Sequence, residues 1–91
     1  MRLAIIGLGY VGLPLAVEFA KKYPVIGFDI NYTRIAELNQ GLDTTLEISS
    51  EELNSVLSLS APHGLTLTSD FHDLAEANCY IVSERKVAMI L

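Results

Sequence analysis

The chain has 91 residues and a formal net charge of −5, and 51% of its residues are hydrophobic, which suffices for the core of one small domain. The acidic balance argues against nucleic-acid binding, which requires a basic surface, and no apolar segment is long enough to cross a membrane. Because Met1-Arg2 leads directly into an expected strand, we expect no signal peptide. A single cysteine, Cys79, excludes an internal disulfide and favours a cytoplasmic location, and with His63 and His72 it shows no metal-ligand spacing.

Residues 1–22 predict a strand, a glycine turn and a helix. Arg2 to Ile6 is a short apolar run without strong alternation, typical of a strand buried on both faces. It is followed by Gly7-Leu8-Gly9-Tyr10-Val11-Gly12, which has the pattern G-x-G-x-x-G. A helical pattern begins there, and Pro14 suits its first turn because that position needs no N–H donor. The expected apolar face of this helix consists of Val11, Leu15 and Phe19, with Ala16 and Ala20 beside them.

Each glycine of this turn has its own physical role. Gly7 permits the tight turn out of the strand, Gly9 lets a pyrophosphate approach the backbone, and Gly12 lets the helix pack closely on the strand. The helix then directs its free N–H groups and positive dipole end at the phosphates. The strand before the motif and the helix after it favour a dinucleotide site over a glycine turn in some other kind of α/β protein.

A carboxylate follows the second expected strand, Val25 to Phe28. Asp29 stands about 20 positions after Gly9, where nucleotide-binding βαβ units place an acid that accepts hydrogen bonds from the adenosine ribose hydroxyls. Asp29 favours NAD over NADP, because it would repel a 2′-phosphate. Its alternative role, compatible with the first, is the N-cap of the next helix. Arg34 has two open roles: it contacts the ribose edge or the adenine face, or it is a solvated surface charge.

The chain beyond Asp29 predicts two further helices before the next strand. Asn31 is the expected N-cap of the first, which carries Ile35, Ala36 and Leu38 on its inner side, and Gly41 ends it. Ser49 to Glu52 predicts a capping box. The helix that it opens has an apolar face made of Leu53, Val56 and Leu57.

The last part of the chain predicts two more strands. Leu65 to Thr68 alternates and predicts a third strand near a sheet edge. Ser69 or Asp70 then caps a short helix that should point Phe71 and Leu74 inward. Cys79 to Val82 is the fourth strand, which its composition predicts to be buried.

Strands that alternate with helices predict an α/β fold with a parallel sheet and right-handed crossovers. We expect a partial Rossmann fold, with about four strands in the order 3-2-1-4 and helices on both faces. The cofactor then lies at the carboxyl edge, where the winding reverses between strands 1 and 4. Ser83, the first residue after the fourth strand, is therefore expected to face the cofactor.

The segment Met1 to Ala16 resembles the N-terminus of the UDP-glucose/GDP-mannose dehydrogenases, and its G-x-G-Y-V-G-L-P string is far more specific than the glycine pattern alone. The branch that it most resembles oxidises UDP-N-acetylhexosamines or related nucleotide sugars in surface-polysaccharide synthesis. The similarity extends to about Ser83. It continues through Val25 to Asn31, Arg34-Ile35, Leu38 to Gly41 and the Asp43-x-Thr45-x-Glu47 stretch.

The resemblance implies an NAD-binding domain of an oxidoreductase. It further implies two successive hydride transfers that take the sugar C6 alcohol to an acid, with an active-site cysteine that captures the intermediate aldehyde. Cys79 is not expected to be that cysteine, because it lies inside an expected strand as a small core residue. The implied pyrophosphate contacts are Gly7, Gly9, Tyr10, Val11 and Gly12, the implied ribose contacts are Asp29 and Arg34, and Leu8 and Ser83 complete the expected cofactor site.

Residues 84–91 depart from the family pattern. We expect residues 1–83 to form the N-terminal half of a dinucleotide-binding domain, and residues 84–91 to be a tail that arises from a natural truncation, a change of reading frame or an artificial end. The leading hypothesis is an NAD-binding part of a UDP-sugar 6-dehydrogenase, inactive alone, with the UDP-sugar bound only by a full-length enzyme. The alternatives are a stand-alone module that binds NAD or another adenine nucleotide, and a folded remnant that binds nothing and forms a homodimer through its tail.

Overall fold

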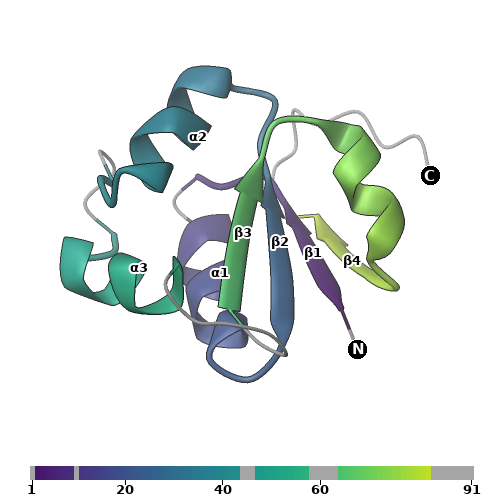
Figure 1. Ribbon diagram of the computed structural model, residues 1–91, viewed down its shortest axis with the longest axis horizontal. Helices are drawn as coiled ribbons and strands as arrows, with labels where there is room; N and C mark the ends of the chain where they lie inside the picture. The colour runs from purple at the N-terminus through teal and green to yellow at the C-terminus, as the bar shows by residue number, and fades with distance from the viewer. Residues whose placement is uncertain (1, 10, 44–46, 58–63, 83–91) are drawn as a thin grey trace.

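The computed structural model describes residues 2–9, 11–43, 47–57 and 64–82. Within these ranges strands alternate with helices as the sequence predicts (Figure 1). The elements in chain order are β1 (Leu3–Ile6), α1 (Gly12–Ala20), β2 (Pro24–Phe28), α2 (Tyr32–Asn39), α3 (Ser50–Leu57), β3 (Gly64–Thr68), the 3₁₀ helix η1 (Phe71–Glu76) and β4 (Cys79–Val82).

The strands form a parallel sheet in the order β3-β2-β1-β4, which confirms the predicted partial Rossmann arrangement. In its central row, Ile5 of β1 pairs with Gly27 of β2 on one side and with Ile81 of β4 on the other. Gly27 pairs in turn with Leu67 of β3. Because parallel strands run in one direction, their carboxyl ends meet at a single edge, and the segments that follow β1 and β2 lie together there.

The larger hydrophobic core fills the face of the sheet that α1, α2 and α3 cover (Figure 1). The predicted apolar face of α1 is partly wrong, because Val11 is 67% exposed and Leu15 and Phe19 only pack at the margin of this core. The buried residues follow the helical spacing i, i+3, i+4 and i+7 from Leu13, so the face that meets the sheet is rotated from the predicted one. The side chains that α1 buries completely are Leu13, Ala16, Val17 and Ala20.

The opposite face of the sheet carries a smaller core beneath η1. Ala4 of β1 and Ile26 of β2 pack there with Ala77 and, as predicted, with Leu74. The prediction that Phe71 points inward is wrong, because its side chain is 66% exposed. Phe71 begins η1 just beyond the carboxyl end of β3, and its ring stacks on that of His72 with the centroids 4.6 Å apart.

The predicted burial of β4 is also wrong. Tyr80 and Val82 are 38% and 37% exposed, while Cys79 and Ile81 pack partly buried against the larger core. The reason is position: β4 lies at the edge of the described sheet, where β1 is the one neighbouring strand in the sheet order. An apolar strand composition therefore did not distinguish an edge strand from a central one.

The helix ends follow the predicted capping chemistry. Asn31 caps α2 by accepting a hydrogen bond from a backbone N–H of its first turn, and Gly41, with φ at +80°, ends it. The hydroxyl of Ser49 accepts the backbone N–H three residues further on, at the start of α3 (3.2 Å). Asp70 caps η1, and the hydrogen bonds that it accepts from the backbone and then the ring of His72 lower the pKa of Asp70.

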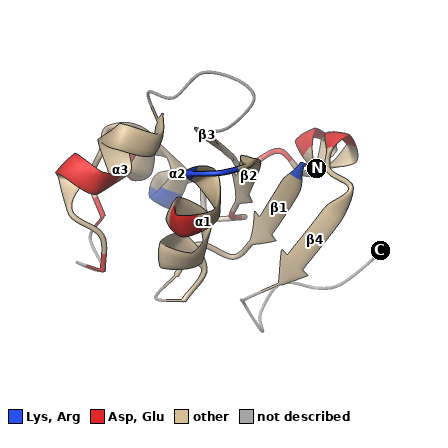
Figure 2. Cartoon of the chain, turned by 90° about the horizontal axis from the view of Figure 1, so that it is seen from below, with Lys and Arg blue, Asp and Glu red and all other residues tan. Residues whose placement is uncertain are grey.

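Acidic residues, coloured red on the cartoon of Figure 2, occur in α3 and η1, in keeping with the net negative charge of the chain. In the part of the chain that the structure describes, no helix is both long enough and apolar enough to cross a bilayer. Pro62-His63, Ser83 and the predicted tail at residues 84–91 lie outside the described residues.

Candidate dinucleotide site

The glycine turn begins directly at the carboxyl end of β1. Gly7 has a φ of +97°, a left-handed conformation that glycine adopts without a steric penalty. Its backbone N–H donates to the carbonyl of Phe28, the last residue of β2, over 2.8 Å. The turn is therefore tied to the neighbouring strand at the edge where the sequence placed the cofactor, and the predicted role of Gly7 in leaving the strand is confirmed.

The N-terminus of α1 follows the turn and suits an anionic ligand. The N–H groups of Leu13 and Leu15 donate to the carbonyls of Gly9 and Val11, each over 3.3 Å, so helical hydrogen bonding starts within the motif. Val11 occupies the N-cap position with an aliphatic side chain that cannot cap, and the first turn contains no acidic residue. The positive end of the helix dipole is thus left to a bound anion such as a pyrophosphate, which fits the group that the motif predicts.

Leu8, between the first two glycines, anchors the turn in the core. Its side chain is 0% exposed and belongs to the larger hydrophobic cluster. Gly27 of β2 makes room for it, because a Cβ at Gly27 would stand 3.2 Å from Leu8 Cδ2 and 3.0 Å from Leu67 Cδ2. The sequence reading missed this role of Gly27; the signal available was a glycine inside an otherwise apolar strand, which often marks a close approach.

Asp29 joins the two halves of the motif. One carboxylate oxygen, Oδ2, accepts the backbone N–H of Leu8 (3.0 Å), and the other, Oδ1, accepts the backbone N–H of Asn31 (2.9 Å). Its alternative role as a helix N-cap is wrong, because Asn31 holds that position in α2. A carboxylate has about four acceptor sites, so the two hydrogen bonds leave capacity for the hydroxyls of a ribose.

Arg34 lies beneath the turn instead of on the surface. It is only 8% exposed, so the alternative of a solvated surface charge is wrong. Its Nε and Nη2 atoms donate to the carbonyl of Leu8 over 2.9 and 2.6 Å, and Nη1 pairs with Asp43 over 2.9 Å. The guanidinium thus contacts the glycine turn from the interior of the protein. A direct contact of Arg34 with the ribose or adenine stays a prediction.

The structure brings together Gly7, Leu8, Gly9, Val11, Gly12, Asp29 and Arg34 at one edge of the sheet. Tyr10 and Ser83, which the sequence also assigned to the site, lie outside the described residues. Among the residues that the structure describes, no group of three or more His, Cys, Asp or Glu side chains could hold a metal ion.

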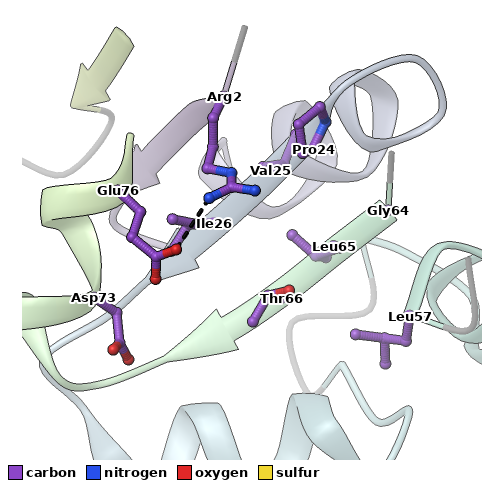
Figure 3. Close-up of a pocket in the computed structure, with 10 residues that line it drawn as sticks. All are labelled: Arg2, Pro24, Val25, Ile26, Leu57, Gly64, Leu65, Thr66, Asp73 and Glu76. Atoms are coloured by element: carbon purple, nitrogen blue, oxygen red, sulfur yellow. Dashed lines mark hydrogen bonds and ion pairs between the residues drawn. The ribbon is translucent and has the colours of Figure 1, made fainter. Parts of the chain in front are cut away.

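A separate hollow of about 400 Å³ lies near the amino ends of the strands (Figure 3). Pro24 and Gly64, the first residues of β2 and β3, line it together with Thr66. An ion pair between Arg2 and Glu76, 3.0 Å long, crosses its wall. This hollow is at the opposite end of the strands from the glycine turn and contains none of the predicted site residues.

The fold and the site together define a Rossmann-type dinucleotide-binding unit, with a glycine turn after β1 and an acid after β2. Residues 1–84 match the family described as the UDP-glucose/GDP-mannose dehydrogenase family, NAD binding domain. The chain belongs to this family of oxidoreductases, and its matched segment corresponds to sequence of the family's NAD-binding domain.

Individual relatives agree with this assignment. The chain is 52% identical over 83 residues to a UDP-N-acetyl-D-glucosamine 6-dehydrogenase of Pseudomonas aeruginosa, covering 91% of this chain and 18% of that protein. A solved UDP-D-ManNAc dehydrogenase of Pyrococcus horikoshii superposes with a TM-score of 0.81 at 39% identity, over 90% of this chain and 19% of that one. A GDP-mannose dehydrogenase of Pseudomonas aeruginosa, solved as a ternary complex, gives a TM-score of 0.78 at 28% identity, over 98% of this chain and 20% of that one. The chain thus spans about a fifth of the length of these proteins.

Proposed function

We propose that this chain binds NAD as the first part of an NAD-dependent UDP-sugar 6-dehydrogenase. The pyrophosphate lies over Gly7 to Gly12 and the N-terminus of α1, and Asp29 accepts hydrogen bonds from the adenosine ribose. The observation that carries this proposal is the hydrogen bond from Leu8 N–H to Asp29. This hydrogen bond supports the proposal because it holds the acid after β2 beside the glycine turn after β1, an arrangement that one dinucleotide could span.

The full reaction that we propose is the oxidation of the C6 alcohol of a UDP-N-acetylhexosamine to the acid, in polysaccharide synthesis. The substrate class rests on the 52% identity to the 6-dehydrogenase of Pseudomonas aeruginosa. NAD supplies the hydride acceptor, and the residues of this chain bind and orient its adenosine half. Cys79 packs against the larger core within β4 and is not placed as a nucleophile. We therefore propose that the chain binds NAD and does not oxidise UDP-sugars by itself.

The direct test is Gly9→Val, titrated with NAD by calorimetry beside the unchanged chain. Valine at this position places two methyl groups in the space of the pyrophosphate, so NAD binding should be lost while the circular dichroism spectrum is retained. Ala75→Val, at an exposed position on η1, is the matched control and should bind NAD normally. Equal NAD affinity in the Gly9 variant would show that the glycine turn is not the site.

A parallel assay follows the absorbance of NADH with UDP-N-acetylglucosamine as substrate. We expect no rate above that of the enzyme-free control. A steady rate would contradict the proposed inactivity of the isolated chain. NAD binding without turnover also distinguishes the proposal from the remnant alternative, which requires that no nucleotide binds.

A further inference from the structure

The carbonyl group of Leu8 is held by a buried two-pronged contact. Nε and Nη2 of Arg34 both donate to this one oxygen, over 2.9 and 2.6 Å. The planar guanidinium fixes the direction of the two N–H bonds, so it fixes the orientation of the carbonyl as well as its distance. Asp29 holds the N–H of the same residue over 3.0 Å. Both peptide groups that flank the Leu8 Cα are therefore set by charged side chains from the β2–α2 region.

Asp43 in turn fixes the guanidinium. Its side chain is 0% exposed, and its Oδ1 pairs with Nη1 of Arg34 over 2.9 Å. Its Oδ2 accepts the backbone N–H groups of Glu47 and Ile48, each over 2.9 Å. Because both oxygens are engaged, Asp43 cannot turn without breaking contacts to the segment that leads into α3. The chain of contacts therefore runs from the approach to α3, through Asp43 and Arg34, to the cofactor loop.

This arrangement has a consequence for the Leu8–Gly9 peptide. A trans peptide is planar, and its C=O and N–H groups point in opposite directions. With the Leu8 carbonyl directed at the buried guanidinium, the N–H of Gly9 points away from it, toward the outer side of the loop. We propose that Arg34 and Asp43 are positioning residues that hold this peptide in the orientation that receives the dinucleotide pyrophosphate. This inference rests on the proposed function of the loop and assigns Asp43 a role that its sequence position does not reveal.

If the Arg34–Asp43 pair served only to stabilise the fold, its variants would differ in NAD affinity from the variants of a positioning pair. Removing one partner of a buried ion pair leaves an uncompensated charge, whereas replacing both partners by apolar residues of similar size is often neutral for stability. The double variant Arg34→Met with Asp43→Asn removes both charges and keeps a side-chain oxygen for the N–H groups of Glu47 and Ile48, so it should regain stability that Asp43→Asn alone loses. It cannot regain the clamp on the Leu8 carbonyl. If the pair serves stability alone, NAD affinity should recover with stability; if it positions the loop, affinity should stay low.

The experiment compares the unchanged chain with Asp43→Asn, Arg34→Lys and the double variant. The control is Glu76→Gln, which removes the exposed Arg2–Glu76 ion pair at the other end of the strands. Three quantities are measured for each: the melting temperature, the NAD dissociation constant by calorimetry, and the NMR shifts of the Leu8 carbonyl carbon and the Gly9 amide nitrogen without ligand. The shifts report the Leu8–Gly9 peptide directly and need no cofactor.

We expect each Arg34 or Asp43 variant to move the Leu8 and Gly9 shifts and to weaken NAD binding by about tenfold or more, the double variant included. Arg34→Lys should behave in the same way, because an ammonium cannot reproduce the two-pronged contact. Glu76→Gln should change neither the Leu8 and Gly9 shifts nor the NAD affinity. Unchanged shifts in Asp43→Asn, or normal NAD affinity in a stable double variant, would overturn the inference. If the unchanged chain does not bind NAD, the proposed function fails, and the ligand-free shifts still decide whether Arg34 and Asp43 orient the loop.

Discussion

The carboxylate of Asp29 accepts the backbone N–H of Leu8 across 3.0 Å, which joins the end of β2 to the glycine turn after β1. The second oxygen accepts the N–H of Asn31 at the start of α2. One side chain therefore holds the glycine turn, the end of β2 and the start of the next helix in a fixed relation.

The first prediction concerns Asp29→Asn. Both carboxylate oxygens accept backbone N–H groups, so an amide of the same shape must turn its own NH₂ group toward one of these donors. We expect a loss of about 1–3 kcal/mol in the free energy of unfolding, measured by urea denaturation, together with weaker NAD binding. Asp70→Asn is the matched control, because Asp70 uses a single oxygen, Oδ1, for both of its contacts and an amide retains one oxygen. Equal losses in the two variants would contradict the role given to the second oxygen of Asp29.

The second prediction concerns the choice of cofactor. A 2′-phosphate on NADP would meet the charge of Asp29, and the nearby guanidinium of Arg34 is buried between Leu8 and Asp43 and cannot neutralise it there. We expect NAD to bind at least about tenfold more tightly than NADP, a difference of about 1.4 kcal/mol. Calorimetric titration of both nucleotides at one ionic strength measures it. A preference for NADP would show that Arg34 leaves its buried position and faces the ribose.

The third prediction concerns Gly27→Val. The added Cβ would stand 3.0 Å from Leu67 Cδ2 and 3.2 Å from Leu8 Cδ2, and the extra methyl groups need still more space. We expect a destabilisation of about 1–3 kcal/mol from overpacking and a weaker affinity for NAD, because Leu8 must shift and moves the turn with it. Thr66→Val, at an exposed position of β3, is the control for a valine introduced into the same sheet away from Leu8. Normal NAD affinity in a folded Gly27 variant would show that the anchoring of Leu8 does not govern the loop.

The sequence was sufficient for those features that local chemistry determines. The order of the strands follows from the βαβ alternation and its handedness, and the caps at Asn31, Gly41 and Ser49 follow from residue type. The glycine turn and Asp29 were recognisable because their roles depend on spacing along the chain. Gly7 and Asp29 follow β1 and β2 as the pattern predicted, and their contacts with a cofactor stay a prediction.

Features that depend on packing between distant segments were not recognisable. The contact between Arg34 and the Leu8 carbonyl joins residues that are 26 positions apart, and neither residue type predicts it. The exposure of Phe71 and of β4 depends on which helices cover each face of the sheet. The amino-acid composition of these segments does not predict that coverage. The helix α1 carries apolar residues on two neighbouring faces, and the sequence alone does not show that the face starting from Leu13, rather than the one with Leu15 and Phe19, meets the sheet.

NMR mapping of NAD binding on the uniformly ¹⁵N-labelled chain tests directly whether the dinucleotide binds at the glycine turn and Asp29. We predict that NAD shifts the amide signals of Gly7, Gly9, Gly12 and Leu13 most strongly, followed by those of residues 29–31, all at the carboxyl edge of the sheet. The signals of Arg2, Thr66 and Glu76, in the hollow near the amino ends of the strands, should stay unchanged. Shifts concentrated at that hollow, or no shifts at saturating NAD, would contradict the assignment of the glycine turn and Asp29 as the dinucleotide site.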